Sequence, residues 1–324
     1  MSVQPPRLQE DATTVASTVA HLIPPAPRPA RRPVKRFAGA SVNLLYVPAL
    51  ALFAVFTVYP LVSGVRLSFT DWDGYSPSWS WIGWSNYARL FTDATFRSVL
   101  LTTFVYGIGS TLVQQVLGLG LALALDGKVR GRSAAKAIIY LPVLVSPIVM
   151  GTFYYLLFQY DNGALNDVVV ALGGERHAWL STAASGVTII VIVNSIQFVG
   201  TSMIIYLAGL QSISPEYTEA AMLDGANAWQ RFWTVTLPLL QPAFATSIIL
   251  NLIGGLKLFD VIQVLTGGGP GTATSSVSTL IGTTYFANQA AGYSAAMGVA
   301  LFLIIAILTV LANAALNRRR LEQQ

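Results

Sequence analysis

Three amide side chains lie in segments of the chain that are otherwise almost entirely apolar. Asn194 and Gln197 share one such segment, three positions apart, and Asn251 lies in a later one. An amide both donates and accepts hydrogen bonds, so it suits the hydroxyl groups of an uncharged ligand. An amide left unpaired in hydrocarbon costs several kcal/mol. We therefore expect these side chains either to line a polar path or to form hydrogen bonds between neighbouring helices.

A lysine, a phenylalanine and an aspartate follow at the end of the later apolar segment. Lys257 and Asp260 are three positions apart, so they could pair on one face of a helix. Such a pair would neutralise Lys257, which argues against a strongly anionic ligand. The alternative is a purely local ion pair at the end of the segment. The candidate residues of a substrate path are Asn194, Gln197, Asn251, Lys257, Phe259 and Asp260.

The side chains that carry most enzyme chemistry are absent or scattered. The chain has no cysteine, which excludes thiolate nucleophiles, disulfides and cysteine-bound metals. Its two histidines, His21 and His177, are too far apart in the sequence to indicate a metal site. The glycine-rich run TGGGPGT at 266–272 lacks the Gly-Lys-Ser/Thr ending of a phosphate-binding loop, so we interpret it as a turn. We predict a protein that is not an enzyme and has no cofactor or metal of its own.

The composition indicates a membrane protein. Of the 324 residues, 54% are hydrophobic and only 10% are charged, whereas soluble domains carry about 25% charged residues. The net charge of +5 is not concentrated in a polar, aromatic-rich domain, so no nucleic-acid partner is expected. Residues 1–36 are rich in proline, alanine, threonine and arginine and cannot bury enough surface to fold alone. We predict a disordered cytoplasmic tail over 1–36 and one membrane domain over 37–324.

Long apolar windows must position the candidate residues. A membrane-spanning helix needs about 20 predominantly apolar residues. Within lipid each such segment must be helical, because every backbone polar group needs an internal partner. Prolines inside the windows are expected to bend the helices. The sequence predicts an all-α integral membrane protein with six transmembrane helices at about 42–67, 98–125, 134–158, 186–210, 235–260 and 293–316.

The distribution of lysine and arginine predicts the orientation. These residues are enriched on the cytoplasmic side of membrane proteins. If the N-terminus lies inside, the inside segments are the tail, the loops at 126–136 and 211–234, and the end at 317–324. These segments hold 14 of the 19 lysine and arginine residues, and the outside loops hold three. We therefore predict that both termini lie in the cytoplasm.

The predicted cytoplasmic loop at 211–234 contains a short acidic segment. Ser214 and Pro215 are typical of a helix start. Gly225 costs about 1 kcal/mol inside a helix, so we interpret it as a turn between two short helices or as a place where another backbone comes close. A helix that lies on lipid usually carries lysine and arginine on its polar face, whereas this one carries mainly acids. A protein partner therefore fits this segment better than lipid.

The same segment resembles the cytoplasmic loop of permease subunits of bacterial ABC importers. That family carries Glu-Ala-Ala, three further residues, a glycine, and later a hydrophobic residue followed by proline. The pattern is found here as EAA at 219–221, Gly225 and LP at 237–238. In that family the loop helix docks in a cleft of the ATPase and transmits its closure to the membrane helices. The residues that the resemblance assigns to ATPase coupling are Glu219, Ala220, Ala221, Asp224, Gly225 and Ala226.

Two further stretches, 81–96 and 259–298, are similar to outer loops of the carbohydrate branch of that family, and the resemblance covers about 42–316. It implies a permease subunit of a sugar or oligosaccharide importer, which spans a bacterial inner membrane several times and forms half of the translocation path. The implied partners are a second permease subunit, ATP-binding cassette ATPase subunits that hold ATP and Mg²⁺, an extracytoplasmic solute-binding protein and membrane lipid.

Two other functions are compatible with parts of the sequence. A permease of the same superfamily for glycerol phosphate or another polyol solute should favour arginine or lysine along the path, and Lys257 alone is available. An ion-coupled secondary transporter is expected to show inverted repeats and paired broken helices. No such repeat is seen in the sequence, and that function leaves the acidic loop unexplained.

Overall fold

The computed structural model describes residues 46–127 and 130–321. Across these residues the regular elements are helices, and strand pairing is limited to one isolated bridge between Thr70 and Trp81. The predicted all-α fold is therefore confirmed for the described part of the chain. The predicted disordered tail at 1–36 lies outside the described residues and stays a prediction.

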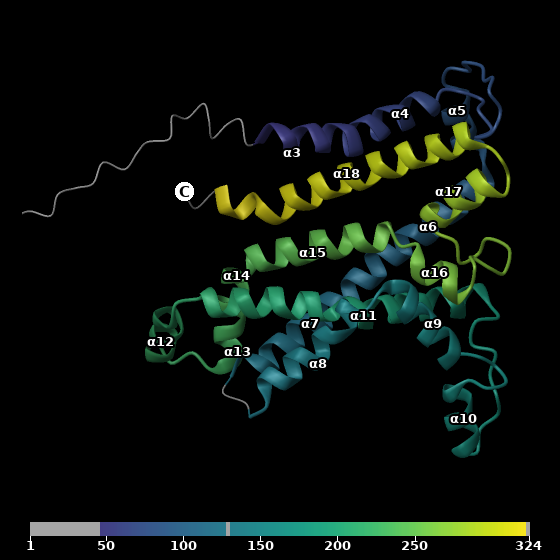
Figure 1. Cartoon of the computed structure of the whole chain (residues 1–324). Coiled ribbons are helices and arrows are strands. Elements are labelled where there is room, and N and C mark those ends of the chain that lie inside the picture. Colours follow the sequence, from purple (N-terminus) through teal and green to yellow (C-terminus); the bar gives the residue numbers. More distant parts are fainter. Residues whose placement is uncertain (1–45, 128–129, 322–324) are drawn as a thin grey trace, which may run out of the picture. The chain divides into compact units, whose positions relative to one another are not determined.

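Four helical segments are long and apolar enough to cross a membrane (Figure 1), and they coincide with four of the six predicted spans. The chain divides into two units between Thr57 and Val58. The boundary falls within a π-helical turn, η1, of the first segment. The segments are Tyr46–Leu67 (α3 Tyr46–Phe53, η1 Ala54–Val58, α4 Tyr59–Leu67), Ala94–Asp126 (α6 Ala94–Phe104, π-helical η2 Val105–Gly109, α7 Ser110–Asp126), Ala183–Ser212 (α11) and Ala291–Leu316 (within α18, Ala291–Leu321).

The predicted span at 134–158 is a broken helix. It consists of α8 (Arg132–Leu144) and α9 (Pro147–Leu157), which meet at 98°. Pro147 has no N–H to continue a helix, and a proline disfavours helical backbone in the residue before it. Ser146 accordingly has a ψ of 135°. The bend that the sequence predicts at a proline of this window is therefore confirmed.

The predicted span at 235–260 is also broken. Residues Ala228–Leu239 and α15 (Gln241–Leu256) meet at 66°, and Pro242 lies in the first turn of α15. By length and composition the described residues thus hold four spans, or up to six if each bent pair counts as one. The other helices are α5 (Ser85–Thr92), α10 (Ala164–Ala171), α12 (Pro215–Leu223), α13 (Ala228–Arg231), π-helical η3 (Phe232–Thr236), α14 (Leu237–Leu239), α16 (Asp260–Leu265) and α17 (Val277–Phe286).

Buried side chains concentrate on α11, which packs against α7, α8 and α15 (Figure 1). Small residues allow membrane helices to approach closely. A Cβ added to Gly118 in α7 would lie 2.5 Å from the Cβ of Ser202 in α11. A Cβ added to Gly255 in α15 would lie 2.8 Å from the Cα of Gly107 and 2.9 Å from the carbonyl oxygen of Tyr106. These close crossings fix the positions of α7, α11 and α15.

A polar junction joins α6 to α18. The Asp93 carboxylate accepts hydrogen bonds from the N–H groups of Thr95 and Phe96 and so caps α6. The Tyr293 hydroxyl donates to the same carboxylate at 2.7 Å, and the Arg89 guanidinium lies 4.0 Å from the centre of the Tyr293 ring. Burial alone would raise the pKa of Asp93, but these hydrogen bonds and the Arg89 charge hold that pKa below its ordinary value. The carboxylate is therefore ionised at neutral pH.

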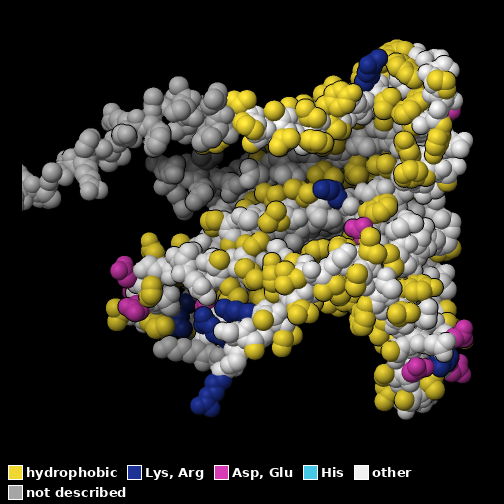
Figure 2. All heavy atoms as spheres, viewed as in Figure 1, with side chains coloured by type: hydrophobic (Ala, Val, Ile, Leu, Met, Phe, Trp, Pro, Cys, Tyr) yellow, Lys and Arg dark blue, Asp and Glu magenta, His cyan; other side chains and the backbone are white. Residues whose placement is uncertain are grey.

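The surface of the helices is strongly apolar. On the face drawn in Figure 2, hydrophobic side chains extend along the helices, whereas aspartate and glutamate gather over α12 at one end and over α10 at the other. Large apolar side chains such as Val116, Leu144 and Phe302 are exposed. A soluble monomer rarely exposes contiguous apolar patches of this extent. The distribution fits helices that are surrounded by lipid.

Candidate functional site

The residues assigned to ATPase coupling lie on a short helix, α12, and in the turn that joins it to a second short helix, α13. The first helix, α12, begins at Pro215 directly after Ser214, as the sequence predicts, and ends at Leu223. Gly225 follows with a φ of +78°, a left-handed conformation that favours glycine. The second helix, α13, begins with a capping box. The predicted turn between two short helices is therefore confirmed.

These two helices and their turn, residues 215–231, are named the coupling segment, and most of the segment is exposed. Leu223 is 90% exposed and Trp229 is also exposed. Large apolar side chains beside acids favour a protein partner over anionic lipid. Leu223 was not expected to be a contact residue from the sequence, although Leu223 lies between Glu-Ala-Ala at 219–221 and Gly225 of the matched motif. Of the six assigned residues, Glu219, Ala220, Asp224 and Gly225 are exposed, and Ala221 and Ala226 are half-buried.

The coupling segment connects two membrane helices directly. α11 ends at Ser212, just before α12, and α13 continues through η3 and α14 into α15. Aromatic rings brace the second connection. The ring centre of Trp233 lies 5.6 Å from that of Trp229 and 5.4 Å from that of Phe232. The coupling segment is therefore continuous with α11 and α15, the helices that carry the three path amides expected from the sequence.

A cavity of about 300 Å³ lies between α7, α11, α15 and the start of α16. This volume is at the lower end of the range for small-molecule sites. Gln114, Phe198 and Thr201 are among the residues that line it. Five of the six predicted path residues line the cavity: Asn194, Asn251, Lys257, Phe259 and Asp260.

The cavity amides use only part of their hydrogen-bonding capacity within the chain. Asn251 Nδ2 donates to Ser202 Oγ at 2.6 Å. Gln114 Nε2 donates to the carbonyl oxygen of Asn194 at 3.2 Å. Gln114 Oε1 has no hydrogen-bond partner among the described residues, although Gln114 is only 1% exposed. A buried acceptor without a donor costs about 1–3 kcal/mol.

The remaining predicted path residue, Gln197, lies outside the cavity wall. Its side chain is buried, and its Nε2 donates to the carbonyl oxygen of Val145 at 3.3 Å, at the break between α8 and α9. Residues three apart on a helix point about 60° apart. This angle turns Gln197 toward α8, whereas Asn194 faces the cavity. Gln197 therefore forms the interhelical hydrogen bond that the sequence analysis left open as an alternative.

The predicted ion pair on one helix face is wrong. α15 ends at Leu256, Lys257 follows its last turn, and Asp260 begins α16 after a break. Among the side chains that the structure describes, Arg176 and Asp167 form the single ion pair with an N–O distance within 4.0 Å. Lys257 and Asp260 therefore do not form an ion pair. Both line the cavity separately. Asp260 therefore does not neutralise Lys257 through an ion pair, and an anionic ligand is not disfavoured on that ground.

The glycine-rich run at 266–272 forms a turn, as interpreted from the sequence. Gly267 and Gly268 have φ values of +59° and +88°, which favour glycine. Just after the run, the backbone carbonyl oxygen of Thr274 accepts a hydrogen bond from the Tyr106 hydroxyl at 2.7 Å. The run is thereby tied to the Ala94–Asp126 segment next to the cavity.

Known proteins resemble the chain in sequence. Residues 116–322 match the family described as "Binding-protein-dependent transport system inner membrane component". The chain is 36% identical over 271 residues to the multiple sugar-binding transport system permease protein MsmF of Streptococcus mutans, covering 83% of this chain and 92% of that protein. It is 32% identical over 267 residues to the trehalose/maltose transport system permease protein MalF of Thermococcus litoralis, covering 82% and 90%.

The fold is similar to that of a solved chain from a bacterial ABC transporter involved in the import of the acidic polysaccharide alginate. The TM-score is 0.74, over 97% of this chain and 99% of that chain, at 23% sequence identity. At this identity the likeness concerns the fold alone. The family match covers more than half of the chain, and the two relatives exceed 30% identity over more than two thirds of it. The chain therefore belongs to the family of binding-protein-dependent transport system inner membrane components.

Proposed function

We propose that this multi-pass membrane protein is the permease subunit of an ATP-driven importer for a sugar or oligosaccharide, and that it forms half of the translocation path. The observation that carries the proposal is the cavity, whose neutral amides and two phenylalanine rings lie between helices that the coupling segment connects. Amides suit hydroxyl groups, and aromatic rings offer apolar faces for a sugar. MsmF and MalF are named for the transport of multiple sugars and of trehalose and maltose.

The energy for import is proposed to come from partner chains. ATPase subunits bind the coupling segment in the cytoplasm and hold ATP and Mg²⁺, so this chain is not itself an enzyme and needs no cofactor. The exposed Leu223 and Trp229 are then covered by the ATPase. A second permease subunit completes the path, and an extracytoplasmic solute-binding protein delivers the sugar. ATP-driven closure of the ATPases moves the coupling segment and switches the cavity between inward and outward access.

A second candidate solute is glycerol phosphate or another polyol, carried by an importer of the same superfamily. The observation that favours it is Lys257, which lines the cavity and forms no ion pair with Asp260. A phosphate oxygen accepts charge-assisted hydrogen bonds from lysine. An ion-coupled secondary transporter is not retained, because the family match assigns the chain to binding-protein-dependent systems. The two broken spans, a feature of some secondary transporters, occur here in a member of another family.

Replacing Asn194 by leucine is expected to lower sugar uptake roughly 10-fold or more, because a buried hydrogen bond to a ligand hydroxyl is worth about 1–3 kcal/mol. Asn251→Leu should act in the same direction, since both side chains line the cavity. The measurement is ATP-driven uptake of a radiolabelled maltooligosaccharide into proteoliposomes that contain the complete importer and its binding protein. The binding protein's own sugar affinity should not change, because that site is on another chain.

Gln263→Leu is the matched control for this experiment, because it makes a comparable change on an exposed residue of α16 outside the cavity wall. Lys257→Gln separates the two candidate solutes. It should spare uptake of the neutral sugar, and it should reduce uptake of glycerol phosphate if a phosphate ester is the solute. Unchanged uptake of both solutes in Asn194→Leu and Asn251→Leu alike would refute the proposed path.

The coupling segment and both termini are proposed to face the cytoplasm, because the predicted inside segments hold 14 of the 19 lysine and arginine residues. The chain has no native cysteine, so a single introduced cysteine reports on one position. A cysteine at Asn227 is expected to react with a membrane-impermeant maleimide only after the cells are permeabilised. A cysteine at Leu172, which is 84% exposed between α10 and α11, should react in intact cells. The reverse labelling pattern would overturn the orientation.

A further inference from the structure

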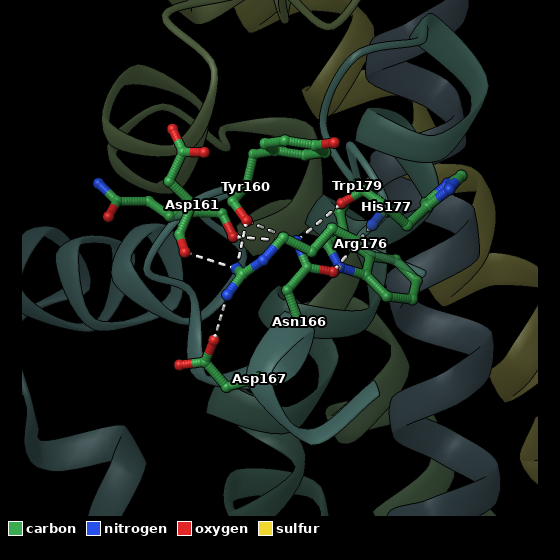
Figure 3. A network of polar contacts seen from close by, with 8 residues as sticks. Tyr160, Asp161, Asn166, Asp167, Arg176, His177 and Trp179 are labelled. Atoms are coloured by element: carbon green, nitrogen blue, oxygen red, sulfur yellow. Dashed lines mark hydrogen bonds and ion pairs between the residues drawn. The ribbon is translucent and has the colours of Figure 1, made fainter. Parts of the chain in front are cut away.

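The buried amide side chains of this protein differ in how much of their hydrogen-bonding capacity they use. Asn166 in α10 is fully buried and uses both of its polar atoms (Figure 3). Its Nδ2 donates to the backbone carbonyl oxygens of Gln159, Tyr160 and His177, and its Oδ1 accepts from the N–H of His177 and from Nε1 of Trp179. Every partner of this amide belongs to the chain, so Asn166 has a structural task.

Gln114 in α7 is a similarly buried amide with one polar atom left over. Its Nε2 donates to the backbone carbonyl oxygen of Asn194 in α11 at 3.2 Å. A carbonyl oxygen only accepts, so the NH₂ group of the amide must face it and the amide cannot be reversed. The leftover atom is therefore the acceptor Oε1, which has no hydrogen-bond partner among the described residues.

The position of Gln114 distinguishes it from the other buried residues with an unpaired polar atom. Gln114 lines the cavity between α7, α11, α15 and the start of α16. The other residues with such an atom in the described part of the chain do not line it: Ser110, Gln115, Gln197 and Ser247. The unpaired acceptor of Gln114 is thus the one that a solute in the cavity can reach.

The side chain of Gln114 is held in place from two sides. Its bond to Asn194 orients the amide. Gly118 lies four residues later on the same face of α7, and there the helix crosses α11 so closely that an added Cβ would lie 2.5 Å from the Cβ of Ser202. An acceptor that is fixed before the ligand arrives costs little entropy on binding. The acceptor is therefore pre-organised.

A fixed acceptor selects the chemical group that can approach it. A hydroxyl has a hydrogen to donate, whereas an ionised carboxylate has none and only accepts. Gln114 is 1% exposed, so bulk water does not readily replace a missing donor. A buried site that is built to bond a hydroxyl strongly rejects an analogue that lacks it.

We propose that Gln114 is a specificity-determining residue of the translocation path, and that its Oε1 accepts a hydrogen bond from one hydroxyl of the sugar. The solute is then a sugar that is uncharged at this position, in preference to one that carries a carboxylate or a phosphate there. This inference rests on the proposed function, because the sugar belongs to it. The alternative is a structural amide that joins α7 to α11 and contacts no solute.

The test compares maltose with its monodeoxyfluoro analogues, since fluorine replaces one hydroxyl without a hydrogen to donate. Uptake into proteoliposomes that contain the complete importer is measured by mass spectrometry. In the unaltered importer, fluorine at one position should slow uptake about 10-fold or more. In Gln114→Met the same ratio should fall to about twofold or less, because the acceptor is gone. The same loaded binding protein serves both importers, so its own preference cancels.

Gln115→Met is the matched control. Gln115 is the next residue of α7, its Oε1 accepts a hydrogen bond from the Tyr206 hydroxyl of α11, and it does not line the cavity. This variant loses a contact between the same two helices, so it should slow all the sugars by one common factor.

Three outcomes would overturn part of the argument. If Gln114→Met also slows maltose and every analogue by one common factor, Gln114 is a structural amide. If the unaltered importer and Gln114→Met discriminate equally, the assignment of Gln114 is wrong while the proposed function stands. If the unaltered importer takes up neither maltose nor any other sugar, the proposed function itself fails.

Discussion

Replacing Gly225 by leucine is expected to reduce ATP-driven uptake roughly 10-fold or more, while the permease still inserts into the membrane. Gly225 has a φ of +78°, and a residue with a side chain loses about 1–2 kcal/mol in that conformation. Apart from the adjacent residues, a Cβ added there would have no described atom within 4 Å. The leucine side chain would instead enter the space that the proposed ATPase contact fills. Uptake and ATP hydrolysis by the reconstituted importer are the measurements.

Gly131 provides a closely matched control. Its φ is +79°, and a Cβ added there also meets no described atom beyond its chain neighbours within 4 Å. It lies in the other predicted cytoplasmic loop, just before α8, so Gly131→Leu carries the same strain without the proposed contact. Gly225→Asn should retain more uptake than Gly225→Leu, because asparagine tolerates the left-handed conformation. Equal losses in Gly225→Leu and Gly131→Leu would assign the effect to strain and remove the support for coupling.

Replacing Gly255 by alanine is expected to lower the free energy of unfolding by about 1–3 kcal/mol or more, as over-packed sites do. The added Cβ would lie 2.8 Å from the Cα of Gly107 and 2.9 Å from the carbonyl oxygen of Tyr106. Both are backbone atoms, so no side-chain rotation relieves the contact, and α15 and η2 must move apart. The measurement is the apparent melting temperature of the detergent-purified protein.

Gly254→Ala is the control that separates the effect of this close contact from the general effect of an alanine in the helix. A Cβ added to Gly254 meets nothing within 4 Å. Gly254→Ala should therefore be neutral or stabilising by up to about 1 kcal/mol, because alanine is the better helix former. Gly107→Ala should be milder than Gly255→Ala, since its nearest neighbours are side-chain atoms of Leu256. A drop in melting temperature that is the same for Gly254→Ala and Gly255→Ala would contradict the close crossing.

The positions of the spans could be predicted because they depend on length and hydrophobicity. The coupling segment could also be predicted, since its cap, its acids and Gly225 are local signals that a short stretch of sequence carries. The 98° angle between α8 and α9 could not. Pro147 predicts a bend, but the size of the bend depends on how α9 packs against α16, and that contact is far away in the sequence.

The cavity residues were harder to assign for a different reason. In a soluble helix the polar face shows which side chains meet water, whereas α11 is apolar on nearly all sides and gives no such reference. The sequence therefore could not separate Asn194, which lines the cavity, from Gln197, which contacts Val145. It also could not foresee that α15 ends at Leu256. That break removes the helix face on which Lys257 and Asp260 were expected to pair.

The coupling segment is connected to the cavity in two ways, directly through α11 and through α13, η3 and α14 to α15. α11 is one uninterrupted helix of 30 residues, Ala183–Ser212. At a rise of 1.5 Å per residue, Ser212 and Asn194 are about 27 Å apart along its axis. A tilt of about 10° around the far end of such a rod displaces the other end by about 5 Å by the same geometry. The connection through α15 bends by 66° before it reaches the cavity, so it carries a displacement in a changed direction, whereas α11 carries it along one axis.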